Sequence, residues 1–366
     1  MAIATSYPGL YLNEETAVNL SVTSSATAIP VFTFEKRDTE YAPSATMLHL
    51  NNWAEFYALI GRDDSGSHFF DSLKFWFMSG GGPCYMVRRE HLIEELVKYD
   101  DITLVVEAGS VLSAETTQKQ QMYADFLTVR QQMPTLFGLF DGLQSDISNA
   151  ESVDEFMKYH PATPYAAAFY PWQKVDWSSS AIPPSVVAAV SIARTDRVRG
   201  VWKAPANVVI NGITPMFSVS NNIQAKYYRG KALNMIRRFG STGTVVWGSR
   251  TLEDSDKWRY IPVRRLFGMA EHDIRKLLRG LIYEPNSSIT WQRVKVALDS
   301  YLHDLWKKGA LAGSKPEEAW FVEVGKNITM SEEEISQGKL IIRVGMAAVR
   351  PAEFILLEFS QKIAML

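Results

Sequence analysis

The chain has 366 residues, of which 46% are hydrophobic and 21% charged, and its formal net charge is −2. This length leaves room for two ordinary domains. The composition excludes a largely disordered chain, and the small net charge excludes a protein that binds nucleic acid through bulk positive charge. The first predicted feature is the turn Tyr7-Pro8-Gly9, between short strand-like stretches that have little core of their own.

Alternating strand and helix patterns follow up to the middle of the chain. The expected elements are a strand at 23–34, a helix at 52–61, a helix, glycine turn and strand at 69–89, a strand at 101–109, a helix at 118–132 and a strand at 134–142. Strands that alternate with helices predict an α/β fold with a partly parallel sheet.

A looser stretch at 169–185, rich in aromatic residues, serine and proline, is the expected domain boundary. The elements expected beyond it are a strand and turn at 193–213, a helix at 221–239, a strand at 243–252, helices at 266–283 and 288–308, a strand at 318–325 and two terminal strands.

The two terminal strands differ in pattern. Leu340, Ile342, Val344 and Met346 alternate with other residues, as in a strand with one buried face, whereas Phe354–Leu357 is apolar throughout. An exposed edge of this kind invites aggregation. Two interpretations stay open at this point: the last strand pairs inside its own fold, or it pairs with another chain by strand addition.

No motif for catalysis or metal binding stands out. The glycine cluster at 79–85 lacks the Lys-Ser or Lys-Thr pair of a phosphate loop, the six histidines are scattered, and no nucleophile elbow occurs. Cys84 has no basic neighbour, so we expect a buried inert thiol rather than a nucleophile. We therefore expect no catalytic residue, no metal, no cofactor and no enzyme. Without a signal peptide pattern or a run of 18 apolar residues, we also expect no membrane insertion.

Positive charge is concentrated in one region. Residues 226–279 contain thirteen Lys or Arg and five Asp or Glu. Arg275, Lys276 and Arg279 lie on the first of two expected helices. On the second, four basic residues lie outside the apolar stripe: Arg293, Lys295, Lys307 and Lys308. A solvated basic face and a surface for an acidic partner both fit this pattern.

Several ordered blocks are similar to the sheath subunits of contractile phage tails, R-type pyocins and related extracellular injection particles. They are "SYPGLYLNE", "WAEFYALIG", "PPSVVAAVSIARTDRVRGVWKAPAN" (183–207), "ALNMIRRFGSTGTVVWGSRTL" (232–252), the stretch 279–322 and "VRPAEFILLEF". Two departures from the family pattern occur. Val186–Val190 replaces the usual Gly-Ala-Val-Ala-Gly run, and residues 90–165 are only loosely similar.

The resemblance implies a two-domain tail-sheath fold, with mixed α/β sheets flanked by helices and extended strand arms at both ends. The implied parts are an N-terminal arm (1–22), an outer α/β domain (23–185), an inner tube-facing domain (186–345) and a C-terminal arm (346–366). The implied function is a structural subunit that polymerises as a six-start helical sheath around an inner tube and stores the energy of contraction. The implied partners are further copies of the chain, the inner tube protein, the baseplate and tail-terminator or cap proteins, with no nucleic acid.

Residue roles follow from the same resemblance. The arms would add strands to neighbouring subunits, and 16–25 and 345–351 would bend as linkers. The arm residues are Tyr7, Leu10, Tyr11, Leu12, Phe354, Ile355, Leu356, Leu357 and Phe359. Arg275, Lys276 and Arg279 would contact the tube, with Arg293, Lys295, Lys307 and Lys308 as second choice. A motif of Trp202, Lys203, Pro205 and Asn207 would lie at the domain junction.

The resemblance also implies assembly in the bacterial cytoplasm, as part of a phage tail or of a released extracellular particle. Two other functions remain. One is an α/β enzyme whose active site is built from dispersed residues, which a cluster of titratable groups in one cleft would support. The other is a non-contractile tail component, against which the length and the two-half organisation speak.

Overall fold

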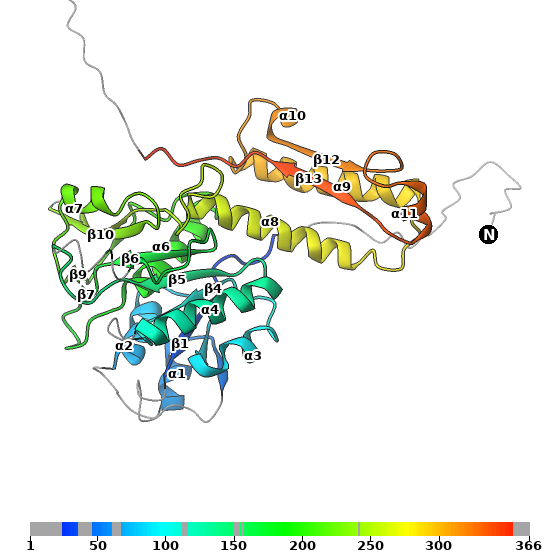
Figure 1. Cartoon of the computed structure of the whole chain (residues 1–366). Helices are drawn as coiled ribbons and strands as arrows, with labels where there is room; N and C mark the ends of the chain where they lie inside the picture. Colours follow the sequence, from blue (N-terminus) through cyan, green and yellow to red (C-terminus); the bar gives the residue numbers. More distant parts are fainter. Residues whose placement is uncertain are drawn as a thin grey trace, which may run out of the picture.

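The structure is a computed structural model of the whole chain. It describes residues 24–35, 46–60, 67–111, 116–148, 154, 157–240 and 242–353. Two parts are visible in Figure 1: a broad α/β part, here called the body (residues 24–269), and a narrow part of helices and two strands, here called the lobe (residues 270–346). A mixed α/β fold was predicted from the sequence and is confirmed.

The body is built on a nine-stranded mixed sheet. Six neighbouring strands pair in parallel, and the outer strands β2, β11 and β8 pair antiparallel. In sheet order the strands are β2 (Met47–Leu50), β3 (Cys84–Arg88), β1 (Pro30–Phe34), β4 (Leu104–Val106), β5 (Phe137–Asp141), β6 (Ala166–Tyr170), β10 (Leu233–Phe239), β11 (Gly243–Trp247) and β8 (Val209–Ile210). Central strands such as β4 and β5 are buried along their whole length, as strands covered on both faces require.

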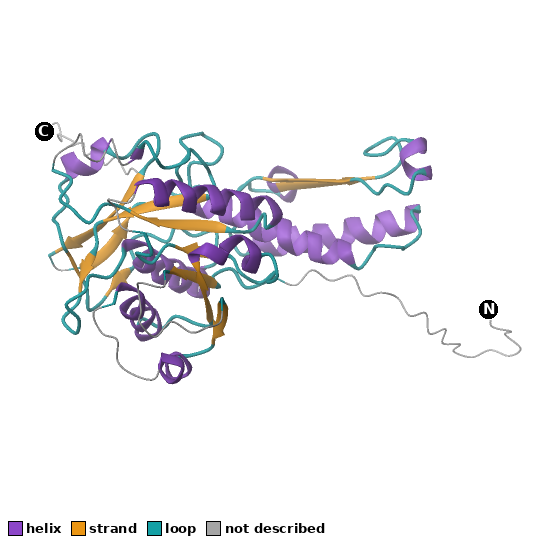
Figure 2. Cartoon of the chain, turned by 60° about the horizontal axis from the view of Figure 1, so that its bottom comes forward, coloured by secondary structure: helices purple, strands orange, loops and turns teal. Residues whose placement is uncertain are grey.

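Helices cover both faces of this sheet. Figure 2 shows them above and below the strands. One apolar cluster joins the sheet to α1, α2 and α6, and a second joins it to α3 and α4. The helices are α1 (Trp53–Ile60), α2 (His68–Met78), the 3-10 turn η2 (Arg89–His91), α3 (Leu92–Leu96), α4 (Thr116–Gln132), α6 (Pro184–Arg199) and α7 (Asn221–Lys226). Two short strands outside the main sheet, β7 (Gln173–Lys174) and β9 (Thr214–Pro215), pair with each other.

Two elements differ in type from the sequence predictions. The strand expected from residue 193 is wrong, because α6 runs to Arg199 and is buried on all sides over its first nine residues. Pro184 occupies the first helical turn, where a missing N–H is tolerated. The helix expected at 221–239 ends at Lys226, and Leu233–Phe239 is strand β10 instead. In β10 the first four residues are buried on both faces, and this pattern resembles a helical stripe in the sequence alone.

The sheet also crosses the predicted domain boundary at residue 185. Strand β10 pairs with β6, and α6 packs on β5, so elements from both sides of residue 185 share one core. The change from body to lobe lies within α8 (Ile261–Arg279) instead. The first half of α8 is mostly buried, with Ile261 in a core of the body, whereas Leu266, Ala270 and Leu277 belong to the core of the lobe.

The lobe is a small layer of helices and strands with its own apolar core. Figure 2 shows it projecting from the body as a narrow unit. Besides the end of α8, it contains α9 (Ser288–Lys307), α10 (Pro316–Ala319), β12 (Trp320–Val324), α11 (Glu332–Ser336) and β13 (Ile342–Met346). The predicted helix at 288–308 and strand at 318–325 are confirmed within a few residues.

No helix among the described residues is long and apolar enough to cross a membrane. The same described ranges contain no group of three His, Cys, Asp or Glu side chains that could hold a metal ion. Cys84 is buried in the body, and burial raises its pKa, which suits an unreactive thiol.

Candidate assembly site

The lobe carries a sheet of only two strands in the part of the chain that the structure describes. β12 and β13 pair antiparallel, with Trp320 opposite Met346 and Val324 opposite Ile342. Each of the two therefore has an outer edge with no neighbouring strand among the described residues. Such an edge presents a row of backbone N–H and C=O groups, which another strand can bind.

The two faces of this sheet differ in chemistry. Val322 is buried against the lobe core, and the partly buried Ile342, Val344 and Met346 pack on the same core, so the alternation predicted for β13 is confirmed. On the outer face the half-exposed ring of Phe321 lies over Gly345, where a Cβ atom would be 2.2 Å from Cε1 of the ring. Only glycine leaves room for the ring at this position.

Residues 347–353, here called the strap, lead from β13 back toward the body (Figure 1). The N–H of Ala347 donates a 2.8 Å hydrogen bond to the carbonyl of Ala319, and the N–H of Val349 donates to the carbonyl of Ala310 at 3.2 Å. The carbonyl of Ala347 accepts from the N–H of Ala312 at 2.7 Å. The first half of the strap is therefore hydrogen-bonded to the lobe, although 345–351 was predicted to be a bending linker.

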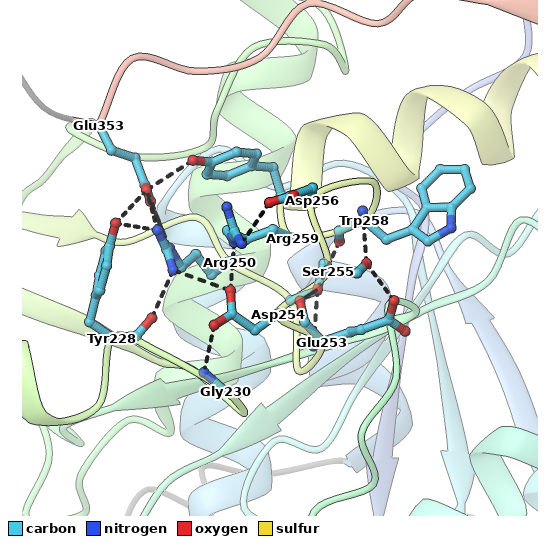
Figure 3. Close-up of polar contacts among 12 residues, drawn as sticks. Tyr228, Gly230, Arg250, Glu253, Asp254, Ser255, Asp256, Trp258, Arg259 and Glu353 are labelled. Atoms are coloured by element: carbon cyan, nitrogen blue, oxygen red, sulfur yellow. Dashed lines mark hydrogen bonds and ion pairs between the residues drawn. The ribbon is translucent and has the colours of Figure 1, made fainter.

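At the end of the strap, Glu353 contacts the body (Figure 3). Its Oε2 accepts a 2.7 Å hydrogen bond from Nη2 of Arg250, and its Oε1 accepts from Nε of Arg250 at 3.1 Å. The hydroxyl groups of Tyr228 and Tyr260 each donate to Oε2 at 3.1 Å. We call these four residues the clasp. Glu353 is at least 93 residues from the other three in the sequence, and the clasp joins the strap to the body.

Both charged groups of the clasp are largely removed from water, with the side chain of Arg250 8% exposed and that of Glu353 18% exposed. Burial opposes the charged form of Glu353, but the hydrogen bonds from Arg250, Tyr228 and Tyr260 outweigh it and lower the pKa of the carboxyl. Burial, together with the nearby Glu353, raises the pKa of Tyr228 to about 12. The clasp is therefore a charged, paired cluster at neutral pH.

The loop before α8 holds Arg250 in place. Nη1 of Arg250 donates to the carbonyl of Tyr228 at 3.0 Å, and the guanidinium carbon lies 3.5 Å from the centre of the Tyr228 ring. Asp254 lies 3.7 Å from Nη1 of Arg250 and also binds Arg259 and the N–H of Gly230, as Figure 3 shows. The arginine is thus positioned from several sides before Glu353 contacts it.

A second anchor holds the N-terminal end of the described chain. The N–H of Ser25 donates to Oδ1 of Asp273 on α8 at 3.0 Å, and the hydroxyl of Tyr301 on α9 donates to Oδ2 of the same carboxylate at 2.7 Å. Thr27 donates to Asp196 on α6 at 2.6 Å, and its carbonyl accepts from Arg265 at 2.7 Å. The chain therefore enters the described part beside α8, where the body meets the lobe.

Several known proteins are similar to this chain in sequence and in structure. The model of the phage tail sheath C-terminal domain matches residues 253–362. A chain from the sheath complex of an extracellular contractile injection system, PVC, in its contracted state is 43% identical, with a TM-score of 0.89 and 99% of each chain covered. A chain from the baseplate of the anti-feeding prophage (AFP), in its contracted state, is 52% identical, with a TM-score of 0.88, covering 98% of this chain and 100% of that one. This chain belongs to the tail-sheath family. It is a contractile sheath subunit.

A curated relative is more distant from this sheath subunit. A prophage major tail sheath protein of Pseudomonas aeruginosa (strain UCBPP-PA14) is 25% identical over 189 residues, which are 50% of this chain and 46% of the relative. The sheath subunit thus spans under half of the length of this relative. The resemblance predicted from the sequence is confirmed.

The predicted basic residues of the sheath subunit lie in two places. Arg275, Lys276 and Arg279 line a cavity of about 340 Å³ between α8 and the body, with Asp100 and Asp101 on its other side. Arg275 forms an ion pair with Glu271 at 2.7 Å, and Arg279 lies 3.6 Å from Asp100. The second set, Arg293, Lys295, Lys307 and Lys308, is exposed along and just beyond α9. The structure therefore brings the first set together and spreads the second set along a helix.

The motif at 202–207 forms the loop after α6. The Trp202 ring lies over Gly200, which has a φ of +91°, and packs against the lobe core. Lys203 is exposed, whereas Pro205 is buried and its carbonyl accepts a 2.8 Å hydrogen bond from Ser191. Asn207 has a φ of +59° and donates its N–H to the carbonyl of Val246. The loop thus lies between the sheet and the lobe core.

The predicted arm residues of the sheath subunit lie outside the described residues. They are Tyr7, Leu10, Tyr11, Leu12, Phe354, Ile355, Leu356, Leu357 and Phe359. Sequence reasoning also missed the clasp, because its members are up to 125 residues apart. The signal available in the sequence was a single acidic residue, Glu353, between Pro351 and the apolar run that follows it.

Proposed function

We propose that copies of this sheath subunit polymerise as a six-start helical tube around a rigid inner tube protein. The subunits assemble in an extended lattice, and contraction drives the inner tube through a target envelope. No nucleotide is needed, because the free energy is stored in two alternative packings of the same chain. The baseplate triggers the change at one end, and a terminator or cap protein closes the other.

The observation that carries this proposal is the two-stranded sheet of the lobe. Both of its edges lack a neighbouring strand among the described residues. The N-terminal residues 1–22 precede the anchor at Ser25, and residues 354–366 follow the clasp at Glu353. Strands lent by neighbouring copies would complete the sheet by main-chain hydrogen bonds, which survive a rotation of whole subunits. Residues 1–22 and 354–366 would thus serve as the linking arms, because 346–353 are bonded within their own subunit.

A basic surface would contact the inner tube, and the structure supports one helix more than the other. Arg275 and Arg279 already pair with Glu271 and Asp100. Within the described ranges, Arg293, Lys295, Lys307 and Lys308 form no ion pair. Arg293 lies between the exposed Ile289 and Val296 on the outer face of α9, and Lys307 lies three turns further along the same face. We therefore expect α9 to contact an acidic tube surface, with the α8 residues as the second candidate.

We further propose that assembly takes place in the bacterial cytoplasm and that the product is a phage tail or a released extracellular particle. A role as an enzyme fits the described residues less well. Glu107, Lys119 and Asp141 form a titratable cluster in the body, but their side chains are at most 2% exposed. A buried cluster offers a substrate no access.

Electron microscopy of the purified chain tests the proposal. The full chain is expected to form hollow, ridged cylinders. A variant that lacks 354–366 is expected to remain monomeric, because it has lost the proposed C-terminal arm, and circular dichroism checks that it is folded. A variant that lacks only 360–366 is the matched control, since it keeps the apolar run 354–359. Cylinders formed by the 354–366 deletion would contradict the role of the C-terminal arm.

A further inference from the structure

Residues 354–359 have two possible pairing partners, and one of them is strand β13 of the same subunit. Arg350-Pro351-Ala352-Glu353 suits a four-residue β-turn, because proline is favoured at its second position. A turn there would lay 354–359 antiparallel against 344–349, on the free edge of β13. The apolar run would then complete the sheet of its own subunit, and it would not be available to a neighbouring subunit.

The clasp is incompatible with this hairpin. Val349 is bonded to Ala310 in the lobe, whereas the carboxylate of Glu353 is bonded to Arg250 in the body. The strap leads away from β13 between these two points, as Figure 1 shows. A β-turn would instead bring the Cα atoms of Arg350 and Glu353 within about 7 Å of each other and point the following residues back to the lobe. Glu353 therefore cannot bind Arg250 and form the end of this β-turn at the same time.

We propose that the Arg250–Glu353 clasp prevents the hairpin and thereby commits residues 354–359 to the lobe sheet of a second copy. This inference rests on the strand exchange proposed above, and it names the residues that decide which copy receives the strand. The clasp also sets the distance that the exchanged strand can span. The exchanged strand 354–359 follows Glu353 directly, and its six residues span at most about 22 Å when extended. The receiving copy must therefore be an immediate neighbour.

Competition between the two pairings explains why a clasp is needed. A strand tethered by a short linker meets its own acceptor edge at an effective concentration in the millimolar range. Separate copies at micromolar concentration are at a disadvantage of about a hundredfold or more. Holding the strap extended removes this intramolecular advantage, because the four turn residues are no longer free. The clasp thus acts on the choice of partner rather than on the strength of the strand pairing.

A cross-linking experiment distinguishes the two pairings. Ala347→Cys and Leu356→Cys would lie opposite each other in the hairpin, and the natural Cys84 is buried. If the hairpin forms, a short bismaleimide links the two cysteines within one subunit and gives a monomer on a denaturing gel. If the strand is exchanged, the same reagent links neighbouring subunits and gives a ladder of oligomers on the gel. The clasp is broken by Glu353→Gln, with Arg250→Gln as a second variant. Glu332→Gln removes an exposed carboxylate paired with Lys326 and is the matched control.

We expect ladders from the parent cysteine pair and from Glu332→Gln. Glu353→Gln should raise the internally linked fraction by at least about tenfold and reduce the material that sediments as polymer. Unchanged ladders in Glu353→Gln and in a folded Arg250→Gln variant would overturn the role of the clasp while leaving the sheath proposal intact. A parent chain that sediments only as monomer would instead contradict the proposed sheath function.

Discussion

Arg265 on α8 and Asp196 on α6 form a bidentate ion pair, with N–O distances of 3.0 and 2.7 Å and with only 4% and 5% of their side chains exposed. The same two residues bind Thr27 near the N-terminal end of the described chain. One buried pair therefore fixes the helix that links body and lobe and also the point from which the N-terminal arm departs.

The first prediction concerns this pair. Asp196→Ala leaves the Arg265 guanidinium buried without a counter-charge, so we expect the free energy of unfolding to fall by about 3–5 kcal/mol. Urea denaturation followed by fluorescence measures the change. The exposed pair of Glu323 and Arg343 is the control, for which Glu323→Ala should cost about 0–1 kcal/mol. Equal losses in both variants would show that burial of the first pair has no special weight.

The second prediction concerns the outer face of the lobe sheet. Gly345→Ala places a methyl group where the Phe321 ring lies, so the ring must move away. We expect a loss of stability of about 1 kcal/mol, at the lower end of the range for overpacking, because the half-exposed ring can turn toward solvent. Adding Phe321→Ala should restore most of that loss, because the clash is removed. A double variant that is no more stable than Gly345→Ala would point to backbone strain at residue 345 instead.

The third prediction is a pH dependence of the clasp. The folded state lowers the pKa of Glu353 below its ordinary value of 4.5. Its contribution is therefore complete above about pH 4.5 and is lost as the pH falls through the folded pKa. The stability difference between the wild-type chain and Glu353→Gln should be present at pH 7 and shrink as the pH is lowered below 4.5. A difference that stays constant over this range would show that the charge of Glu353 is not what stabilises the clasp.

The fourth prediction separates the two candidate tube surfaces. Charge reversal of Arg293 and Lys307 on α9 should leave sheath polymers intact but abolish extended sheath on tubes, because exposed charges without a partner in the described chain are available to an acidic surface. Charge reversal of Arg275 and Arg279 should have the smaller effect, since both already have acidic neighbours. Co-sedimentation with the tube protein measures both. A larger loss of tube binding from the Arg275 and Arg279 reversal would show that α8, and not α9, contacts the tube.

The sequence predicted those elements whose pattern is local. The apolar stripe of α9 and the alternation in β13 each follow one period, and both elements form where they were expected. Prediction failed where tertiary burial decides: α6 and β10 are buried on several sides, so their apolar residues show no clear period. The clasp was not predictable, because no local rule links Arg250 to Glu353, 103 residues away.

The contractile sheath reading is tested most directly by a cryo-EM map of the assembled polymer. We expect a lobe sheet in which β12 and β13 are flanked by strands from other copies, with 354–359 of one subunit on the sheet of an immediate neighbour and Glu353 still bound to Arg250. A lobe sheet that stays two-stranded in the polymer, or one completed by the C-terminal residues of the same subunit, would contradict it.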